Sequence, residues 1–320
     1  MTTALSTHGD KLTCFTAALA SALLARGETR WWRPLLAGGP VLAVTPAPQE
    51  LLLFEHDAVA PLPALGFGVR GEDDWATAYH AIEEEVAEHG SVVLLADIFH
   101  LPWQHGYRKW HAPHWLAIVA TLDGWVVEDP LTMTTELGPQ TGQRVPVTSA
   151  AELRSWSVSL GPDDTVALLR EQAMAGAPEI AVGRTYRWLE TRPAERRAPR
   201  PDRLVGADAL VALASRYQFA ATPDDFTQLD DLWQALRQRE LLLWAAEFDD
   251  EVLDDAGRAH WDRAVAQWRT LPPLLMHARM RAAAGGTVQT ALIAETLLAL
   301  AEYEGKHLAF AHRRPEGTWR

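Results

Sequence analysis

Cys14 is the only cysteine in this 320-residue chain, and it begins a segment, residues 14–27, with the composition of a helix. Alanine and leucine dominate the segment, and Gly27 is a common type of helix stop. The N–H groups and the positive end of the dipole at a helix start favour a thiolate over a thiol. Cys14 is therefore a candidate nucleophile; the alternative is a small buried hydrophobe in an alanine-rich helix.

A nucleophilic thiol needs a base, and a histidine and an acid follow it in the chain. His114 opens the apolar run 115–120, Asp123-Gly124 comes next, and residues 125–129 end at Asp129. This pattern predicts a hairpin of two strands. Cysteine, histidine and acid stand in this order in papain-like enzymes, where the histidine activates the sulfur and the acid fixes the histidine's tautomer.

The register of this hairpin decides whether the two side chains meet. A tight turn at Asp123-Gly124 places Asp129 opposite Ile118, which shares a strand face with His114 but lies about 13 Å farther along the strand. On that register a Cys14–His114–Asp129 triad requires a wider loop, or a bulge between Thr121 and Gly124.

Three further residues are candidates for supporting roles. His8 stands six residues before Cys14, the offset at which papain-like proteases place an oxyanion-hole glutamine, and a histidine can donate there too. Disorder of the N-terminus is the alternative for His8. Asp97 ends a predicted buried strand, 91–97, either as a strand-end cap or as a partner of His111 or Lys109. We expect His111 to be structural or to support the site, with His114 as the base.

We expect no metal site and no bound cofactor. Four histidines lie between residues 100 and 114, but Pro113 prevents a helix that would align His111 with His114, and a strand turns them to opposite faces. The glycines of 66–71 match a dinucleotide-binding pattern, yet Pro61 and Pro63 break the strand that should precede it, so we expect a loop there.

Composition and charge exclude several classes of protein. With 48% hydrophobic and 22% charged residues, the chain resembles an ordinary soluble protein. Neither a signal peptide nor a membrane-spanning run is visible, so we expect a cytoplasmic protein without membrane association. A net charge of −13 argues against a nucleic-acid partner, and a single cysteine excludes an intrachain disulfide.

The chain changes character at a basic, proline-rich stretch. Residues 1–190 mix helical and strand patterns, which predicts an α+β domain, and residues 205–320 predict an all-helical domain. Between them, residues 191–204 are typical of a linker. A solvated connector is the simpler interpretation of its arginines; the alternative is a docking patch for an acidic partner, formed by Arg196, Arg197 and Arg200.

Several short motifs together resemble the N-terminal domain of the butirosin biosynthesis protein H family. They are the Cys14 helix, the segment 92–103 that ends in Leu-Pro-Trp, the histidine pair His111 and His114, and Asp129 followed by proline. The resemblance covers about the first 190 residues. Trp103 stands where tyrosine is common in the family, and Ala120-Thr121 replaces a frequent glycine.

The resemblance implies a papain-like fold and cysteine-dependent acyl transfer in specialised-metabolite biosynthesis. Cys14 matches the nucleophile, His114 the base and Asp129 the orienting acid. The acyl group would come from the thioester of an acyl or peptidyl carrier protein, with phosphopantetheine present only as part of that substrate, and would pass to a small-molecule acceptor. Cyclisation or thioester hydrolysis by the same triad, a cysteine peptidase or amidase, and a non-catalytic carrier-binding scaffold remain alternatives.

Overall fold

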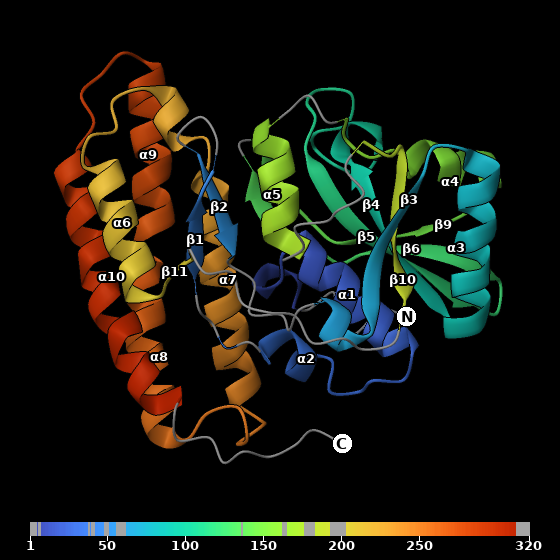
Figure 1. The fold of residues 1–320 in the computed structure, drawn as a ribbon, viewed down its shortest axis with the longest axis horizontal. Helices are drawn as coiled ribbons and strands as arrows, with labels where there is room; N and C mark the ends of the chain where they lie inside the picture. Colours follow the sequence, from blue (N-terminus) through green and yellow to red (C-terminus); the bar gives the residue numbers. More distant parts are fainter. Residues whose placement is uncertain are drawn as a thin grey trace. The chain divides into compact units, whose positions relative to one another are not determined.

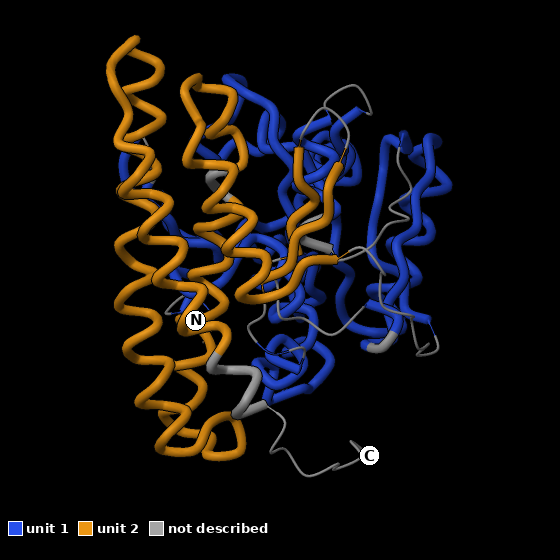
Figure 2. Tube along the Cα trace, turned by 60° about the vertical axis from the view of Figure 1, so that its left-hand side comes forward, with its two compact units in different colours: residues 1–39, 57–199 blue, residues 40–56, 200–320 orange. Residues whose placement is uncertain are grey.

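The computed structural model describes residues 5, 8–37, 39, 42–47, 51–55, 62–135, 137–161, 165–175, 183–192 and 203–311 (Figure 1). The chain forms two compact units: residues 1–39 with 57–199, and residues 40–56 with 200–320 (Figure 2). The first unit mixes helices and strands, and the C-terminal region is mainly helical. The predicted α+β class with a helical C-terminal region is therefore confirmed.

A six-stranded antiparallel sheet forms the centre of the first unit. Its order is β3-β10-β4-β5-β6-β9. The strands are β3 (Phe67–Glu72), β4 (Ser91–Asp97), β5 (Pro113–Thr121), β6 (Gly124–Asp129), β9 (Gln143–Pro146) and β10 (Tyr186–Thr191). The glycine-rich segment 66–71 was expected to be a loop, and this was wrong: most of it is β3, which pairs along its whole length with β10.

Helices cover both faces of this sheet. On one face, α3 (Trp75–His89) and α4 (Ala150–Trp156) pack over a core that includes Leu94, Leu116 and Trp188. On the other, α1 (Cys14–Ala25) places Phe15 edge-on to Trp115, with ring centroids 5.3 Å apart. α5 (Thr165–Ala175) covers the same side and forms a fully buried ion pair with β10. The predicted helix that begins at Cys14 and the predicted strand 91–97 are thus confirmed.

Short elements complete the first unit. They are η1 (Gly9–Lys11), α2 (Trp32–Leu36), η3 (Leu62–Leu65), η4 (Ile98–His100), β7 (Met133–Thr135) and β8 (Gly138–Gln140). Of these, η1 leads into α1, and η4 begins the connection between β4 and β5. Both connections approach the end of the sheet at which β5 starts and β6 ends.

The second unit contains a small sheet in addition to the expected C-terminal helices. β1 (Ala43–Pro46) and β2 (Leu52–Glu55) form a hairpin, and β11 (Leu204–Val205) pairs with β1 to give the sheet β11-β1-β2. The hairpin segment was assigned from sequence to the first domain. It belongs to the second unit because its strand partner and the side chain of Gln228, which bonds both backbone groups of Leu52, come from the later part of the chain.

Helices make up the rest of the second unit. They are α6 (Ala207–Tyr217), η5 (Pro223–Phe226), α7 (Leu229–Ala246), α8 (Asp255–Trp268), α9 (Leu271–Ala283) and α10 (Thr290–Ala311). A buried ion pair between Arg239 and Glu304 joins α7 to α10. Within the described part of the chain, every helix is too short or too polar to span a lipid bilayer. Residues 193–202, most of the predicted linker, lie outside the described residues.

The β5–β6 hairpin has a register that differs from the expected one. Thr121 pairs with Gly124 and Ala117 with Glu128, so the turn consists of Leu122 and Asp123. The turn is tight, and it needs neither the wider loop nor the bulge. It lies one residue earlier than the Asp-Gly signal suggests because Gly124, with φ 125°, is the first residue of β6. The Thr121 hydroxyl closes the turn by donating to the Gly124 carbonyl at 2.8 Å.

Gly124→Ala tests this turn. A φ of 125° is unfavourable for any residue with a Cβ, so we expect the free energy of unfolding to fall by about 1–3 kcal/mol. Gly161→Ala is the matched control, because a Cβ there meets open space and its φ is ordinary. Urea denaturation of the two variants should separate them; equal stability would contradict the register.

Candidate active site

Cys14 is the first residue of α1, and a capping box fixes it there. The Thr13 hydroxyl accepts from the Thr16 N–H at 3.1 Å, and the Thr13 N–H donates to the Thr16 hydroxyl at 2.8 Å. A reciprocal cap of this kind sets the point at which a helix begins. Cys14 is buried, at 8% exposure.

His114 connects Cys14 with Asp129. The imidazole is hydrogen-bonded to Cys14, and its Nε2 lies 2.9 Å from Asp129 Oδ2. Because Nε2 is directed to the carboxylate, Nδ1 is the ring nitrogen left for the sulfur. Both His114 and Asp129 are buried, at 3% and 2% exposure. The structure thus brings together the three residues that the sequence grouped.

The observed register explains how Asp129 reaches His114. Continuing the pairing beyond Ala117 and Glu128 sets Asp129 opposite Leu116, on the strand face that Leu116 shares with His114. His114 is then a diagonal neighbour, at a distance of about 7–8 Å that side chains can bridge. The expected register would have doubled the separation along the strand.

Two more side chains, Trp103 and Gln104, donate to Asp129. Trp103 Nε1 lies 2.8 Å and Gln104 Nε2 lies 2.6 Å from Oδ2, the oxygen that also meets His114. Oδ1 is buried and has no hydrogen-bond partner among the described residues. Gln104 in turn accepts from Gln140 Nε2 at 2.6 Å. In the sequence, Trp103 stood out only because the butirosin biosynthesis protein H family commonly has tyrosine there. No sequence pattern pointed to Gln104 or Gln140.

The electrostatic environment favours the charged forms of both His114 and Asp129. Burial alone would lower the pKa of His114, but the Asp129 charge and the hydrogen bonds to Asp129 and Cys14 raise that pKa to about 10. Burial alone would raise the pKa of Asp129, yet the His114 charge and the donors His114, Trp103 and Gln104 hold it below its ordinary value. At neutral pH the imidazolium and the carboxylate therefore coexist.

Asp97 and His111 form a second, separate pair. Asp97 Oδ1 accepts from the backbone of Phe99 and Ala112, each at 3.1 Å, and Oδ2 lies 2.5 Å from His111 Nδ1. His111 also stacks on Phe99, with centroids 4.3 Å apart. Both alternatives for Asp97 are thus confirmed together: it caps the end of β4 and partners His111. The pair closes the two ends of the loop that carries Trp103 and Gln104.

His8 lies at the start of η1, and its segment runs beside the end of β6. The carbonyl of the neighbouring Gly9 accepts from the Thr132 N–H at 3.1 Å, and a Cβ at Gly9 would overlap the Pro130 carbonyl. Burial and the nearby Lys11 lower the pKa of His8, against the effect of Asp10. The candidate docking residues Arg196, Arg197 and Arg200 lie outside the described residues.

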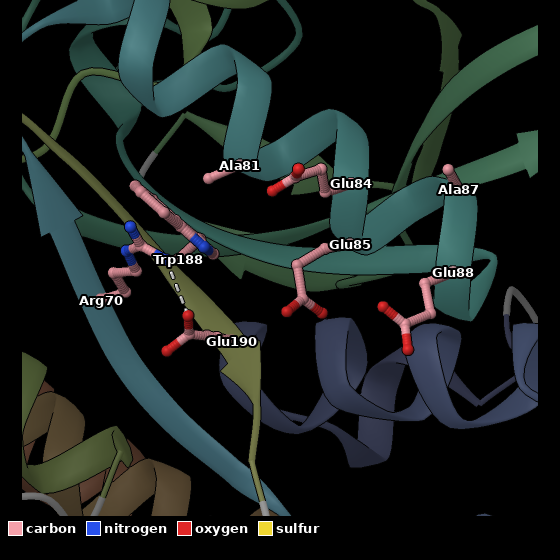
Figure 3. Close-up of a pocket in the computed structure, with 8 residues that line it drawn as sticks. All are labelled: Arg70, Ala81, Glu84, Glu85, Ala87, Glu88, Trp188 and Glu190. Carbon is pink, nitrogen blue, oxygen red and sulfur yellow. Dashed lines mark hydrogen bonds and ion pairs between the residues drawn. The ribbon is translucent and has the colours of Figure 1, made fainter.

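A separate cavity of about 540 Å³ lies between α3, β3 and β10 (Figure 3). Half of its lining residues are acidic: Glu84, Glu85 and Glu88 on α3, and Glu190 on β10. Glu85 pairs with Arg26, just after the C-terminal end of α1, whereas Cys14 begins that 12-residue helix. The two ends are about 18 Å apart at the usual helical rise. This cavity is therefore not part of the Cys14 cluster.

The sequence matches no protein-family model and no curated protein. In the described part of the chain, no three histidine, cysteine or acidic side chains gather to hold a metal ion. Evidence on function comes from the site's geometry and from the motifs in the sequence.

The pKa of His114 predicts how stability depends on pH. Its folded value of about 10 exceeds the ordinary 6.5, so the native state holds the proton more tightly than the unfolded chain. This contribution to stability is complete below pH 6.5 and is lost as the pH rises to about 10. The free energy of unfolding should therefore fall more steeply from about pH 7 to about pH 10 in the wild type than in His114→Gln. Parallel declines in urea denaturation would contradict the pairing.

Proposed function

We propose that this chain is a cysteine-dependent acyltransferase of specialised metabolism, with a papain-like first unit that acts in the cytoplasm. One observation carries the proposal: a buried imidazole bridges the thiol at a helix start and a buried carboxylate. This is the arrangement that activates a cysteine nucleophile. The resemblance of the motifs around Cys14, His114 and Asp129 to the butirosin biosynthesis protein H family supports acyl transfer among the reactions such a site can perform.

In the first step, Cys14 Sγ attacks the thioester carbonyl carbon as a thiolate, while His114 already carries the proton on Nδ1. The oxygen of the tetrahedral intermediate takes the negative charge, which N–H groups at the start of α1 are placed to stabilise, with His8 as a further candidate donor. The carbon–sulfur bond of the substrate then breaks. The leaving thiolate takes the proton from His114, and the acyl group remains on Cys14 as a thioester.

In the second step, the acceptor attacks the acyl-enzyme. His114 Nδ1 takes the acceptor's proton, and the bond between the acyl carbon and Cys14 breaks. Asp129 stays ionised throughout and holds the imidazole orientation through Nε2. An amine acceptor gives acyl transfer, a nucleophile within the acyl chain gives cyclisation, and water gives hydrolysis.

The acyl donor in this proposal is a carrier-protein thioester. An acidic carrier would be attracted to a basic patch, and Arg196, Arg197 and Arg200 remain the candidates within an otherwise acidic sequence. The alternative function that a specific observation favours is a non-catalytic scaffold. Cys14 is only 8% exposed, as expected of a thiol that belongs to the core. A peptidase or amidase would use the same three residues on an amide substrate.

Intact mass spectrometry tests the acyl-enzyme directly. Incubation with N-acetylcysteamine thioesters should add one acyl mass to the wild type and none to Cys14→Ala, which should remain folded because alanine suits a helix start within an alanine-rich segment. Rapid capture of native Cys14 by iodoacetamide at neutral pH would exclude an inert buried thiol. Labelling only after unfolding would instead support the scaffold.

Variants at the two histidines test which one is the base. His114→Ala should abolish acyl transfer, because it removes the imidazole that bridges the thiol and Asp129. His111→Ala should retain a measurable fraction, and Asp129→Asn should be milder than His114→Ala because an amide can still orient the imidazole. The kcat values of the three variants decide the order; a greater loss in His111→Ala would reassign the base.

A further inference from the structure

We propose that Gln140 and Gln104 form a directional amide relay that positions Asp129 toward His114. The proposal rests on the proposed function for its catalytic consequence, and its geometry stands by itself. The relay has three links: the His105 N–H to Gln140 Oε1 at 3.1 Å, Gln140 Nε2 to Gln104 Oε1 at 2.6 Å, and Gln104 Nε2 to Asp129 Oδ2 at 2.6 Å. Gln104 and Gln140 are positioning residues here.

A backbone group sets the direction of the relay. A side-chain amide has an oxygen end and a nitrogen end that can exchange places by a flip. The His105 N–H can only donate, so it requires the oxygen of Gln140 to face it. The nitrogen of Gln140 must then face Gln104, and the oxygen of Gln104 must accept. The NH₂ group of Gln104 is thereby turned to Asp129.

This direction matters because Gln104 also lies beside the imidazole. Gln104 Nε2 is 3.1 Å from His114 Nε2. If Gln104 were flipped, its oxygen would repel Asp129 Oδ2 and would compete with it for the His114 N–H. In the observed orientation both Gln104 and His114 donate to the same carboxylate oxygen. The relay therefore leaves Asp129 as the acceptor for His114 Nε2.

Burial makes the orientation of the Asp129 carboxylate depend on the hydrogen bonds of the relay. Gln104 and Gln140 are 8% and 5% exposed, so water is a poor substitute for their hydrogen bonds. Asp129 Oδ1 has no partner in the part of the chain that the structure describes, and the orientation of the carboxylate consequently depends on the donors at Oδ2. Trp103 is a second such donor, but its indole has no oxygen end and cannot be misdirected.

Gln140→Glu and Gln140→Leu test the direction. In Gln140→Glu, an ionised carboxylate still accepts from His105 but cannot donate to Gln104, whereas a protonated carboxyl group regains a donor. At pH 8 both variants should lose about 10–100-fold in kcat, as for other residues that orient a catalytic group, with KM within about twofold. On lowering the pH to 5, Gln140→Glu should recover at least about tenfold relative to Gln140→Leu, the size of effect expected when a buried acceptor regains its donor.

Gln289→Glu is the matched control, because it makes the same change at an exposed position of the second unit, just before α10. It should behave as the wild type at every pH. The rate of Cys14 alkylation by iodoacetamide is measured alongside kcat for each variant, and it should follow the same pattern. Because alkylation needs no acyl substrate, it tests the relay even if the acyl-transfer proposal fails.

Two results would overturn the relay. The first is identical behaviour of Gln140→Glu and Gln140→Leu across the pH range, which would reduce Gln140 to a packing residue. The second is alkylation of both variants at the rate of Gln289→Glu. Thermal melts identify a variant that fails to fold, and in that case the isosteric Gln140→Glu, compared with itself at pH 5 and pH 8, still decides between the two roles.

Discussion

The buried hydrogen bond between His114 Nε2 and Asp129 Oδ2 is the interaction on which the rest of the first unit depends. Two charged groups at 3% and 2% exposure are costly to desolvate, and they are tolerated only where the geometry is good and further donors reach the carboxylate. The surrounding elements meet that demand. The hairpin register sets the separation of the two residues, the capping box brings the start of α1 to the imidazole, and the loop after β4 supplies Trp103 and Gln104.

The loop between β4 and β5 is held at several points. Asp97 and His111 close its ends, Trp103 packs edge-on to Trp156 of α4 with centroids 5.1 Å apart, and Gln104 is held by Gln140. Loop backbone is usually less constrained than a strand or helix, so a site built partly on a loop needs such anchors to keep its geometry. The donors to Asp129 are thus positioned by contacts with α4, β4 and β8.

The sequence was most informative where local chemistry determines the structure. The composition of residues 14–27 predicted α1 and placed Cys14 at its start, and the apolar run 91–97 matched β4. It failed on the hairpin register, because an Asp-Gly pair suggested the turn at 123–124 while the chain uses Gly124 as a strand residue with positive φ. Gln104 and Gln140 escaped notice because a glutamine acquires such a role only through partners that are distant in sequence.

The order of strands has a consequence for synthesis on the ribosome. β10 is the last strand of the first sheet to be made, yet it lies between β3 and β4, so that sheet cannot close until residue 191 has emerged. The β1–β2 hairpin lacks its third strand until β11, at residues 204–205, is made. At about 5–20 residues per second, the interval between the synthesis of β2 and that of β11 lasts roughly 7–30 s, during which the edge of β1 lacks its partner strand. Unpaired edges invite pairing with other chains, so slow translation of the middle of this protein should favour aggregation of the nascent chain.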